Sequence, residues 1–428
     1  MKVLVVNPPA YFDKFPDRHF VEAGSRWSFS FDAPKGNHKF PHYQPYPFSL
    51  GYAVSLLRMV GYEVDAFDGC ALDMDEKEWL DRVEKFMPDF LVTEVPTVSF
   101  PLVMNLLKRA RERFHCQIVV AGPHVTALPR EVPEGFMGLR GEWEAKMPFF
   151  DAIRAKDFRK FPFPDREFFP NGQYSNFEFQ RPSAQILSSR GCFGRCNFCV
   201  ERHVYGWGPY VKLRTPSDVI GEMIYVQKLG AKQVWFDDMS LTAKKWHIEN
   251  LCHEIQRLKV DLSWTAMGDM NVDEETVKLM AEAGCKGIAF GVESIDPEVL
   301  NLIGKPWVSA EKAVSFVKLL RKHGIYSVAT FSLGLVGHSK VSIIRDIKFA
   351  IEQLEADSVQ FSIATPFPTT PFFNFCEKNG YLATRDWTMY DGARYSVVDY
   401  PHLKHGEIEE LYQYAMQVRR EKKLGFRK

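Results

Sequence analysis

Residues 192–199 read CFGRCNFC and place Cys192, Cys196 and Cys199 in the spacing C-x3-C-x2-C. No fourth cysteine lies close by, because the next one along the chain is Cys252. A cubane iron–sulfur cluster normally takes four thiolates, so three neighbouring thiols indicate a cluster with one iron open to another ligand. Thiolates suit iron and help to set the reduction potential of such a cluster.

Other kinds of cysteine site fit this spacing less well. A structural zinc site usually takes four ligands in two paired clips, and no second clip follows, although His203 stands four residues after Cys199. A disulfide framework is unusual in a chain of 428 residues with eight cysteines and no signal peptide. The remaining cysteines mostly lie in or beside apolar runs, where a free thiol behaves as a small hydrophobe. They are Cys70, Cys116, Cys252, Cys285 and Cys376.

The composition is that of an ordinary globular protein of two or three domains, with 46% hydrophobic and 25% charged residues. The 54 Lys and Arg side chains balance 54 Asp and Glu side chains, so no long-range field attracts nucleic acid. No apolar run reaches the roughly 18 residues that a membrane span needs. We expect a cytoplasmic protein with no nucleic-acid partner, in a reducing compartment that suits an oxygen-sensitive cluster.

The N-terminal third alternates short apolar runs with amphipathic segments. Strands are predicted at residues 3–6, 63–67, 90–94 and 117–121, and helices at 50–60, 74–86 and 102–114. This alternation predicts a Rossmann-like, doubly wound parallel sheet, which binds ligands at the carboxyl ends of its strands. A nicotinamide dinucleotide is not expected there, because the chain has no G-x-G-x-x-G motif.

The same alternation returns after residue 182. Strands are predicted near residues 184–188, 233–237, 262–266, 287–291, 326–333 and 358–365, with helices at 217–229, 244–258, 273–283, 310–323 and 340–354. Ser217 and Asp273 are predicted to begin helices, and Gly230, Gly284 and Gly324 to end them. Six strand–helix units predict a (βα)6 partial TIM barrel, whose active site lies at the carboxyl ends of the strands.

These patterns divide the α/β chain into four parts. We expect a Rossmann-like domain at 1–147, a connector rich in Phe and Pro at 148–181, the partial barrel at 182–374 and a C-terminal cap at 375–428. Eleven aromatic residues lie between Tyr11 and Phe48 in a stretch without clear periodicity. Long loops of this kind are often functional, so the stretch is either a lid over a flat, apolar ligand or a loop packed on the domain surface.

The cysteine motif, with an aromatic residue before its last cysteine, resembles the signature of radical S-adenosylmethionine (radical SAM) enzymes. In that superfamily a [4Fe–4S] cluster binds SAM through its open iron and cleaves it reductively to a 5′-deoxyadenosyl radical. The resemblance implies that Cys192, Cys196 and Cys199 hold the cluster and that Phe198 packs beside the adenine of SAM. It also implies the six-unit partial barrel.

Two further strand ends resemble motifs of class B radical SAM proteins. Asp237 and Asp238 follow the second barrel strand and resemble the segment that meets the methionine part of SAM, whose positive groups a carboxylate would orient. Alternatively, Asp238 or Ser240 begins the next helix. Gly291, followed by Glu293 and Ser294, resembles the glycine-rich strand that runs along SAM.

The third and fifth barrel strands depart from the family pattern. Relatives commonly place an Arg shortly after the tryptophan equivalent to Trp264, whereas this chain has Asp269, which faces either a cationic substrate or only the solvent. Asp269 and Glu293 are the candidate catalytic residues. The fifth strand ends in G-L-V-G-H-S where the family has G-L-P-G-E-T, so Val336 and His338 differ, but both glycines of the expected turn remain.

Four N-terminal landmarks resemble the cobalamin-binding-type domain that many class B radical SAM proteins carry. They are the N-P-P at 7–9, Y-P-F-S-L-G-Y at 46–52, A-G-P-H at 121–124 and R-G-E-W-E at 140–144. The resemblance implies that Gly122 and His124 line a cobalamin site. The D-x-H-x-x-G motif that supplies a cobalt-ligating His is absent, since the Gly after His19 comes two residues late. His19 and His124 are therefore weak candidates for a cobalt ligand.

Three functions follow from these observations. The first is a cobalamin-dependent radical SAM methyltransferase acting on an unactivated carbon, with a cofactor set of [4Fe–4S] cluster, SAM and cobalamin. The second is a cobalamin-free radical SAM enzyme that catalyses cyclisation, rearrangement or transfer of a SAM fragment. The third is a sensor with a structural cluster, against which the strand-end motifs argue. We expect a small, flat or apolar substrate and a flavodoxin or ferredoxin as electron donor.

Overall fold

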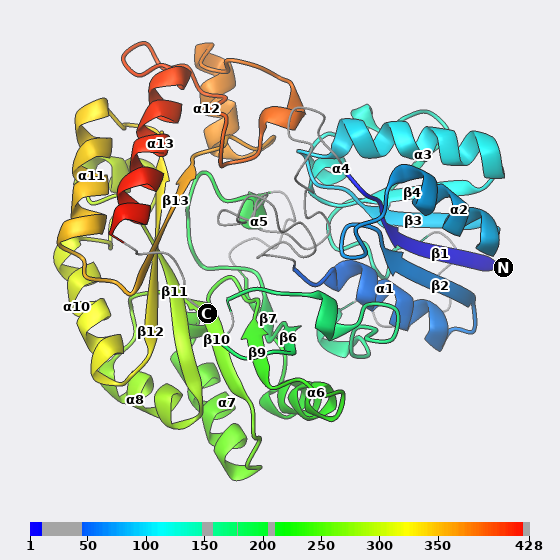
Figure 1. Cartoon of the computed structure of the whole chain (residues 1–428), viewed down its shortest axis with the longest axis horizontal. Helices are drawn as coiled ribbons and strands as arrows, with labels where there is room; N and C mark the ends of the chain where they lie inside the picture. Colours follow the sequence, from blue (N-terminus) through cyan, green and yellow to red (C-terminus); the bar gives the residue numbers. More distant parts are fainter. Residues whose placement is uncertain (11–44, 148–156, 178, 204–209, 423–428) are drawn as a thin grey trace. The chain divides into compact units, whose positions relative to one another are not determined.

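The computed structural model describes residues 1–10, 45–147, 157–177, 179–203 and 210–422 (Figure 1). The described chain forms two compact units. The first comprises the residues up to Asn176 and also takes in Asp386–Asp391, from near the other end of the chain. The second comprises the remainder. The predicted connector is therefore divided between the two units.

The first unit is built on a parallel five-stranded sheet in the order β2-β1-β3-β4-β5. Its strands are β1 (Lys2–Asn7), β2 (Glu63–Asp68), β3 (Phe90–Glu94), β4 (Gln117–Ala121) and β5 (Met137–Gly138). Its helices are α1 (Phe48–Met59), α2 (Glu76–Phe86), α3 (Phe100–Phe114) and α4 (Pro123–Ala127). The predicted Rossmann-like sheet is confirmed. Strand β5 escaped prediction because two residues carry no periodicity.

The second unit is built on a parallel six-stranded sheet in the order β13-β12-β11-β10-β9-β6, which confirms the partial barrel. Its strands are β6 (Ser183–Ile186), β9 (Gln233–Phe236), β10 (Ser263–Gly268), β11 (Cys285–Glu293), β12 (Tyr326–Leu333) and β13 (Ser358–Ile363). The longer helices of this unit are α6 (Pro216–Lys228), α7 (Lys245–Arg257), α8 (Glu274–Glu282), α10 (Ala310–Lys322), α11 (Lys340–Glu352) and α13 (His405–Glu421). α12 (Pro371–Asn379) has nine residues, as α8 does, and α5 (Val200–His203) and α9 (Pro297–Leu302) are shorter.

Local signals explain where these helices begin and end. Asp273 caps α8 by accepting the backbone N–H of Thr276 at 2.9 Å, as predicted. The prediction for α6 was wrong, because Thr215 caps it and Pro216 occupies its first position, so Ser217 already lies inside the helix. The three glycines predicted to end helices all have positive φ, as the left-handed termination requires.

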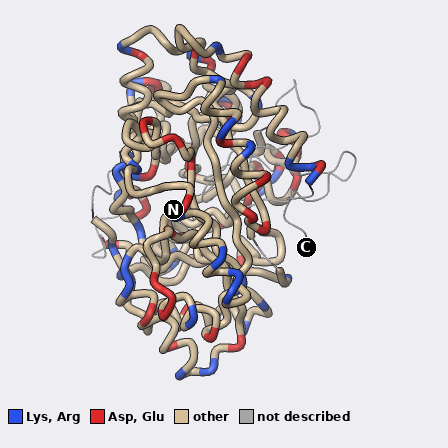
Figure 2. The backbone as a smooth tube through the Cα atoms, turned by 90° about the vertical axis from the view of Figure 1, so that its left-hand side faces the viewer, with Lys and Arg blue, Asp and Glu red and all other residues tan. Residues whose placement is uncertain are grey.

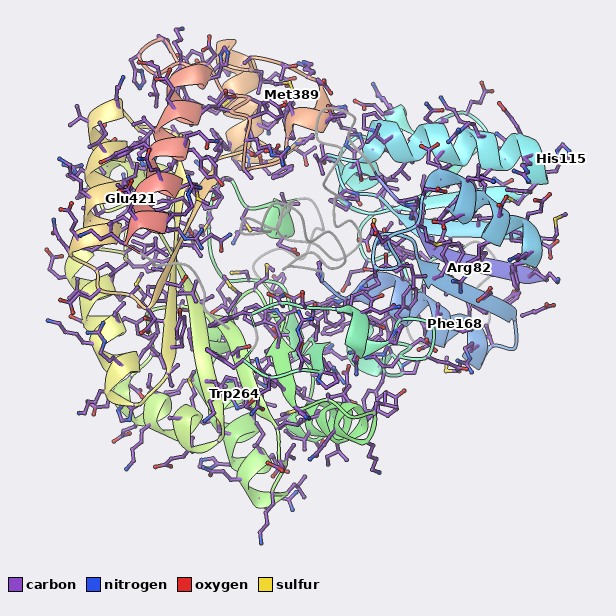
Figure 3. All side chains as sticks on the ribbon, viewed as in Figure 1. Arg82, His115, Phe168, Trp264, Met389 and Glu421 are labelled. Carbon is purple, nitrogen blue, oxygen red and sulfur yellow. The ribbon has the colours of Figure 1, made fainter. Side chains whose placement is uncertain are left out.

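The amino ends of the barrel strands are closed by aromatic residues from the last part of the connector. The side chain of Gln233 is fully buried, accepts the backbone N–H of Phe179 at 2.7 Å and donates to the carbonyl oxygen of Phe177 at 3.2 Å. Gly287 gives the Phe177 ring its space, since a Cβ there would lie 2.4 Å from the ring. Near the same end of the strands, the indole of Trp264, the second residue of β10 (Figure 3), donates to the carbonyl oxygen of Ala283 at 2.8 Å. The open end of the barrel is therefore the carboxyl end of its strands.

Basic and acidic positions are interspersed along the backbone of each unit (Figure 2), as the balanced composition predicts. Among the described residues, no helix is both long enough and apolar enough to cross a membrane. Most of the aromatic stretch at 11–48, and His19 with it, lies outside the described residues. Its last aromatic residues, Tyr46 and Phe48, are buried in the first unit.

Candidate active site

The three cysteines of the motif are set apart from the others by their exposure. Cys192, Cys196 and Cys199 are half-buried, whereas the other five cysteines are buried. A Cβ on Gly194 would lie 3.2 Å from the sulfur of Cys192 and 3.6 Å from that of Cys196, so both sulfurs flank the same small residue. The backbone N–H of Gly194 also donates to the sulfur of Cys192 at 3.2 Å. The loop therefore gathers its thiols where a ligand can reach them.

The donor set fits a cubane cluster better than a single ion. Burial raises the pKa of Cys196 to about 11 and that of Cys199 to about 12, and the neighbouring thiols add to both effects. The thiolates therefore need positive partners, which iron supplies. Among the described residues, no three His, Cys, Asp or Glu side chains converge on one metal position. In a cubane each iron takes its own thiolate, so the thiolates bind different irons and need not converge on a single point.

Glu293, the last residue of β11, forms an ion pair beside the cysteine loop with Lys305, which lies three residues after α9. Lys305 donates to the carbonyl oxygen of Gly291 at 2.9 Å and to the carboxylate of Glu293 at 3.1 Å, and each of the two charged side chains is 12% exposed. Burial opposes the charge of Lys305, but Glu293 and the nearby Cys196 and Cys192 raise its pKa, so it is an ammonium. Ser332 donates to the other carboxylate oxygen of Glu293 at 3.0 Å.

This arrangement explains the glycines around it. A Cβ on Gly291 would lie 2.2 Å from the Glu293 carboxylate and 2.8 Å from the Lys305 ammonium, so the ion pair folds back over that position. Gly304 has a φ of +80°, and a Cβ there would lie 2.5 Å from the carbonyl oxygen of Arg195. Asn197 fastens the same two segments, since its N–H donates to the carbonyl oxygen of Ile303 at 3.1 Å. Lys305 is thus carried on a segment that packs against the cysteine loop.

The paired acids after β9 have different surroundings. Asp237 is buried and accepts the indole N–H of Trp235 at 2.9 Å. Asp238 is fully buried and accepts hydrogen bonds from the backbone and hydroxyl of Ser188 and from the hydroxyl of Ser189. Neither acid begins helix α7, whose first cap position is Lys244. Asp238 is therefore bonded to the chain that leads into the cysteine loop.

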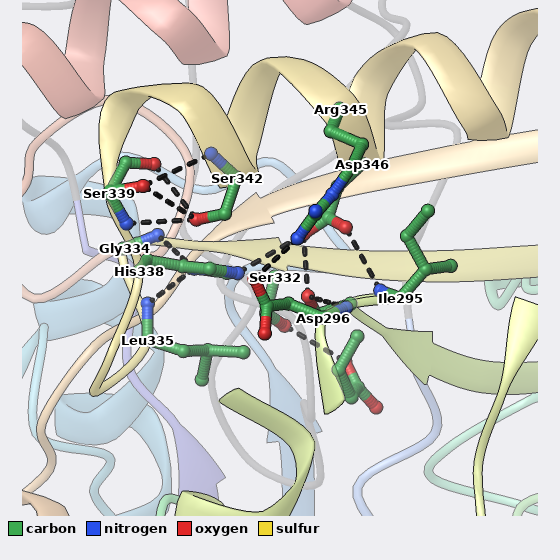
Figure 4. Close-up of polar contacts among 12 residues, drawn as sticks. Ile295, Asp296, Ser332, Gly334, Leu335, His338, Ser339, Ser342, Arg345 and Asp346 are labelled. Atoms are coloured by element: carbon green, nitrogen blue, oxygen red, sulfur yellow. Dashed lines mark hydrogen bonds and ion pairs between the residues drawn. The ribbon is translucent and has the colours of Figure 1, made fainter. Parts of the chain in front are cut away.

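Ser294, the residue after β11, lies in a buried network (Figure 4). Its hydroxyl donates to Asp346 on α11 at 2.7 Å, and Asp346 also accepts from His338 Nε2 at 3.1 Å. His338 Nδ1 accepts the backbone N–H groups of Gly334 and Leu335, which belong to the turn after β12. Gly334 and Gly337, the two glycines of that turn, have φ of +89° and +88°. The network therefore holds the ends of β11 and β12 together.

Asp269 lies half-buried at the carboxyl end of β10. Its carboxylate accepts the backbone N–H of Asn271 at 2.7 Å and the hydroxyl of Ser240 at 3.3 Å. Its own N–H donates to Thr242 at 2.9 Å. Phe198 is likewise half-buried, within the cysteine loop. The candidates from Phe198 to Ser294 thus all belong to the carboxyl ends of the barrel strands or to the cysteine loop.

The two N-terminal candidates belong to the first unit. Gly122 follows β4 with a φ of +105°, and a Cβ there would lie 2.8 Å from the backbone nitrogen of Val95, so only glycine fits. His124 is fully buried and stacks on Phe100 with ring centroids 3.9 Å apart. Its Nε2 lies 3.2 Å from Glu131, which also accepts the indole N–H of Trp387 at 2.9 Å.

Several buried polar atoms remain unsatisfied at the same edge of the first sheet. Within the described chain, Asn7 Oδ1, His124 Nδ1 and Trp143 Nε1 have no hydrogen-bond partner. Buried polar groups without partners are uncommon and often mark a site for a ligand or water. This edge, at the carboxyl ends of parallel strands, is where such sheets bind ligands. Acceptors and donors here would fit the peripheral amides of a corrin.

Comparison with known proteins agrees with the barrel and its cysteine loop. Residues 186–350 match the family model described as the Radical SAM superfamily. The second unit contains a radical SAM domain. The matched span runs from the end of β6 through the cysteine loop and into α11. In the radical SAM domain, a [4Fe–4S] cluster and SAM are thus the expected cofactors.

The likeness extends beyond the radical SAM domain. An uncharacterised methyltransferase of Pyrococcus horikoshii is 27% identical, with the match covering 85% of each chain. The bacteriochlorophyllide d C-12(1)-methyltransferase of Chlorobaculum tepidum is 30% identical over 49% of this chain and 46% of its own length. The chain is thus similar to one methyltransferase over most of its length and to another over about half of it.

A solved structure shares the fold of both units. The radical SAM methyltransferase TsrM of Kitasatospora setae, solved with tryptophan and a SAM analogue, matches 96% of this chain and 82% of its own, with a TM-score of 0.65 and 20% identity. TsrM has also been solved with cobalamin and a [4Fe–4S] cluster bound. The Rossmann-like sheet and the radical SAM domain therefore occur together in a known fold.

Lys305 and Ser332 were not predicted from the sequence, because neither lies in a recognised motif. The nearest signal for Lys305 was Gly304, since a glycine beside a buried lysine indicates a close backbone approach. Arg214 was also missed. It follows β8 (Lys212–Leu213) and donates to the carbonyl oxygen of Leu187 at 2.7 Å, at the entrance to the cysteine loop.

Proposed function

We propose that this chain is a radical SAM methyltransferase that uses a [4Fe–4S] cluster, SAM and cobalamin to methylate an unactivated carbon of a small molecule. The observation that carries the proposal is the half-exposed trio of Cys192, Cys196 and Cys199 beside the Lys305–Glu293 pair, at the carboxyl end of the barrel. The match to the Radical SAM superfamily and the methyltransferase relatives support it. The cofactors supply the reactive centres, and the protein positions them.

The three cysteines would bind the cluster, which when bound would supply the electron for reductive cleavage of SAM. Lys305 would offset part of the negative charge that three thiolates bring. Glu293 has one carboxylate oxygen on Lys305 and the other on Ser332, so its position is fixed for a hydrogen bond from a SAM hydroxyl. Gly291, with no side chain, leaves room for the Lys305–Glu293 pair to fold over the strand. We assign Glu293 and Gly291 to SAM binding.

Asp237 and Asp269 are proposed for two different cationic groups. Asp237 lies one residue after β9, at the carboxyl end of the barrel strands, and would orient the positive methionine part of SAM. Asp269 has no described cationic partner, so it remains available to a polar or cationic group of the substrate. Phe198 would pack against the adenine. Ser294 is bonded to Asp346 and would act by holding the strand end.

Cobalamin would bind at the carboxyl edge of the first sheet, where it would supply a cobalt centre that carries a methyl group. Gly122 keeps that edge clear, and the unsatisfied atoms of Asn7 and Trp143 would bond corrin amides. His124 does not fit as a cobalt ligand, because it is fully buried, with Phe100 stacked on it and Glu131 on its Nε2. We propose that His124 shapes the site without touching cobalt.

The enclosure of His124 also favours the second candidate function, a cobalamin-free radical SAM enzyme that cyclises, rearranges or transfers a SAM fragment. In either case we propose a cytoplasmic enzyme reduced by a flavodoxin or ferredoxin, since an open iron–sulfur site needs a low-potential donor and a reducing compartment.

One anaerobic experiment tests both functions. The cluster is reconstituted, the protein is incubated with hydroxocobalamin and desalted, and iron, cobalt and the absorption spectrum are measured. About four irons with stoichiometric cobalt support methyl transfer, which S-adenosylhomocysteine formation would then confirm. Iron without cobalt favours the cobalamin-free enzyme, with 5′-deoxyadenosine as the product to seek. A chain that holds no iron would overturn both.

A further inference from the structure

The chain enters the cysteine loop through residues 187–191, which we term the loop stem. Within it, β7 (Ser189–Arg190) pairs with β8 in a short antiparallel ribbon. The backbone N–H of Arg214 lengthens the ribbon by donating to the carbonyl oxygen of Ser188 at 2.9 Å. Gly191 ends the stem with a φ of +100°, and a Cβ there would lie 2.2 Å from the carbonyl oxygen of Tyr210. The stem is therefore closely packed up to the residue before Cys192.

Asp238 binds the stem from the end of β9. Its carboxylate accepts the backbone N–H of Ser188 at 3.0 Å, the hydroxyl of Ser188 at 2.8 Å and the hydroxyl of Ser189. His247 Nε2 lies 3.3 Å from the Ser188 hydroxyl oxygen. Because burial lowers the pKa of His247, the neutral ring donates this bond while the hydroxyl donates to Asp238. Three donors from the stem thus meet one fully buried carboxylate.

Arg214 also binds the stem, on the carbonyl of Leu187. Its guanidinium donates to that oxygen at 2.7 Å and is fixed by two carboxylates of α6. One is Asp218 at 2.7 Å, and the other is the fully buried Glu222 at 2.5 Å. Arg214 is itself 4% exposed, so its guanidinium is enclosed in the protein together with the Glu222 carboxylate. Helix α6 therefore fixes the Arg214 guanidinium, and the guanidinium in turn holds the Leu187 carbonyl of the stem.

We propose that Asp238 and Arg214 are positioning residues that fix the loop stem and, through it, the geometry of the cluster held by Cys192, Cys196 and Cys199. This inference rests on the proposed cluster. It gives the adjacent acids two roles, with Asp238 bonded to the loop stem and Asp237 assigned to SAM by the proposed function. Groups that orient metal ligands from behind commonly change metal affinity or activity by about 10–100-fold when they are removed.

The test uses the full chain with the conservative variant Asp238→Asn. The amide oxygen can still accept the two serine hydroxyls, but the NH2 group opposes the backbone N–H of Ser188, so the loop should loosen without loss of the fold. We expect the reconstituted variant to lose iron to a chelator at least about tenfold faster than the wild type. We also expect altered g values for the reduced cluster in the absence of SAM. Asp237→Asn, the matched change one residue away, should leave both properties as in the wild type.

Asp238→Asn with wild-type iron release and an unchanged spectrum would overturn the proposal. If this variant does not fold, Ser189→Ala removes a single donor from Asp238, and Arg214→Lys keeps the charge while it loses the forked geometry. Faster iron release in both supports the proposal, and wild-type release in both overturns it. Failure of the wild type to hold iron is a separate outcome, since it overturns the proposed function before any variant is compared.

Discussion

His338 and Asp346 are joined by a hydrogen bond of 3.1 Å, and both side chains are fully buried. Because His338 Nδ1 accepts two backbone N–H groups, the ring proton must be on Nε2, which donates to Asp346. The related family motif has Glu at this position. In this chain the imidazole of His338 accepts hydrogen bonds from two N–H groups of the turn. Its own Nε2–H group donates a hydrogen bond to Asp346.

This pairing predicts the outcome of exchanging the residue. His338→Gln should be tolerated, since its amide oxygen accepts and its amide nitrogen donates. His338→Glu should lower the free energy of unfolding by about 3 kcal/mol, because it sets a second carboxylate against the buried Asp346. Urea denaturation measures both. The double variant His338→Glu with Asp346→Asn should recover most of the loss, and an additive double variant would contradict the proposed repulsion.

Asp68 predicts a pH dependence in the first unit. Burial raises its pKa from 3.8 to about 6, against hydrogen bonds from Ala71, Asn7 and Tyr174 that lower it. A raised carboxyl pKa means that the folded state binds the proton more tightly. The contribution of Asp68 to stability should therefore fall as pH rises from about 4 to about 6 and stay constant above that. The two pKa values differ by an amount equivalent to about 3 kcal/mol.

Asp68→Asn removes this ionisation and keeps the shape of the side chain. At pH 7.5 the variant should be more stable than the wild type by up to about 3 kcal/mol, and at pH 4 the two should be nearly equal. Denaturation curves at several pH values compare them. If the variant and the wild type are equally stable at both pH values, ionisation of Asp68 does not destabilise the folded protein.

Lys305 predicts a coupled effect on SAM and on the cluster. Lys305→Met removes an ammonium that is bonded to Glu293, so Glu293 loses its fixed position. We expect SAM to bind at least about tenfold more weakly, since a hydrogen bond to a charged group contributes about 1.5–3 kcal/mol. The midpoint potential of the cluster should become more negative, because a nearby positive charge is lost. Lys305→Arg serves as the control and should keep the potential near that of the wild type.

Gly287 and Phe177 predict a compensating pair at the closed end of the barrel. Gly287→Ala places a methyl group where the Phe177 ring lies and should lower the free energy of unfolding by about 1–3 kcal/mol. Adding Phe177→Leu should recover part of that loss, because the smaller side chain leaves room for the methyl group. Thermal unfolding of the single and double variants measures the coupling. Two independent losses would mean that the ring does not occupy this space.

The regular elements were predictable where their patterns were long. An apolar strand followed by an amphipathic helix gives a strong signal, and the eight-residue β12 was located to the residue. The two-residue strands β5, β7 and β8 were missed, because they form only by pairing with segments far along the chain. Register of this kind depends on tertiary contacts and leaves little trace in local sequence.

The sequence predicted the residues proposed to bind the cluster and SAM better than the residues that hold them in position. Cysteine spacing identified the loop, and strand ends identified Glu293. The role of Asp238 could not be read from the sequence, since adjacent acids look alike until their partners are placed. Asp238 meets Ser188, fifty residues earlier, whereas Asp237 meets Trp235. Lys305 was missed for the same reason, because the adjacent Gly304 indicates a close backbone approach without showing that the approaching residue is Arg195.

The inclusion of Asp386–Asp391 in the first unit has a consequence for the ancestry and dissection of the protein. Trp387 from that segment shares Glu131 with His124, so a first unit cut off near residue 176 would expose an aromatic face that the whole chain covers. The two units are therefore not consecutive segments of the chain joined by a single linker. A split protein would need the short C-terminal segment returned in trans, and recombination between relatives would have to exchange both segments together.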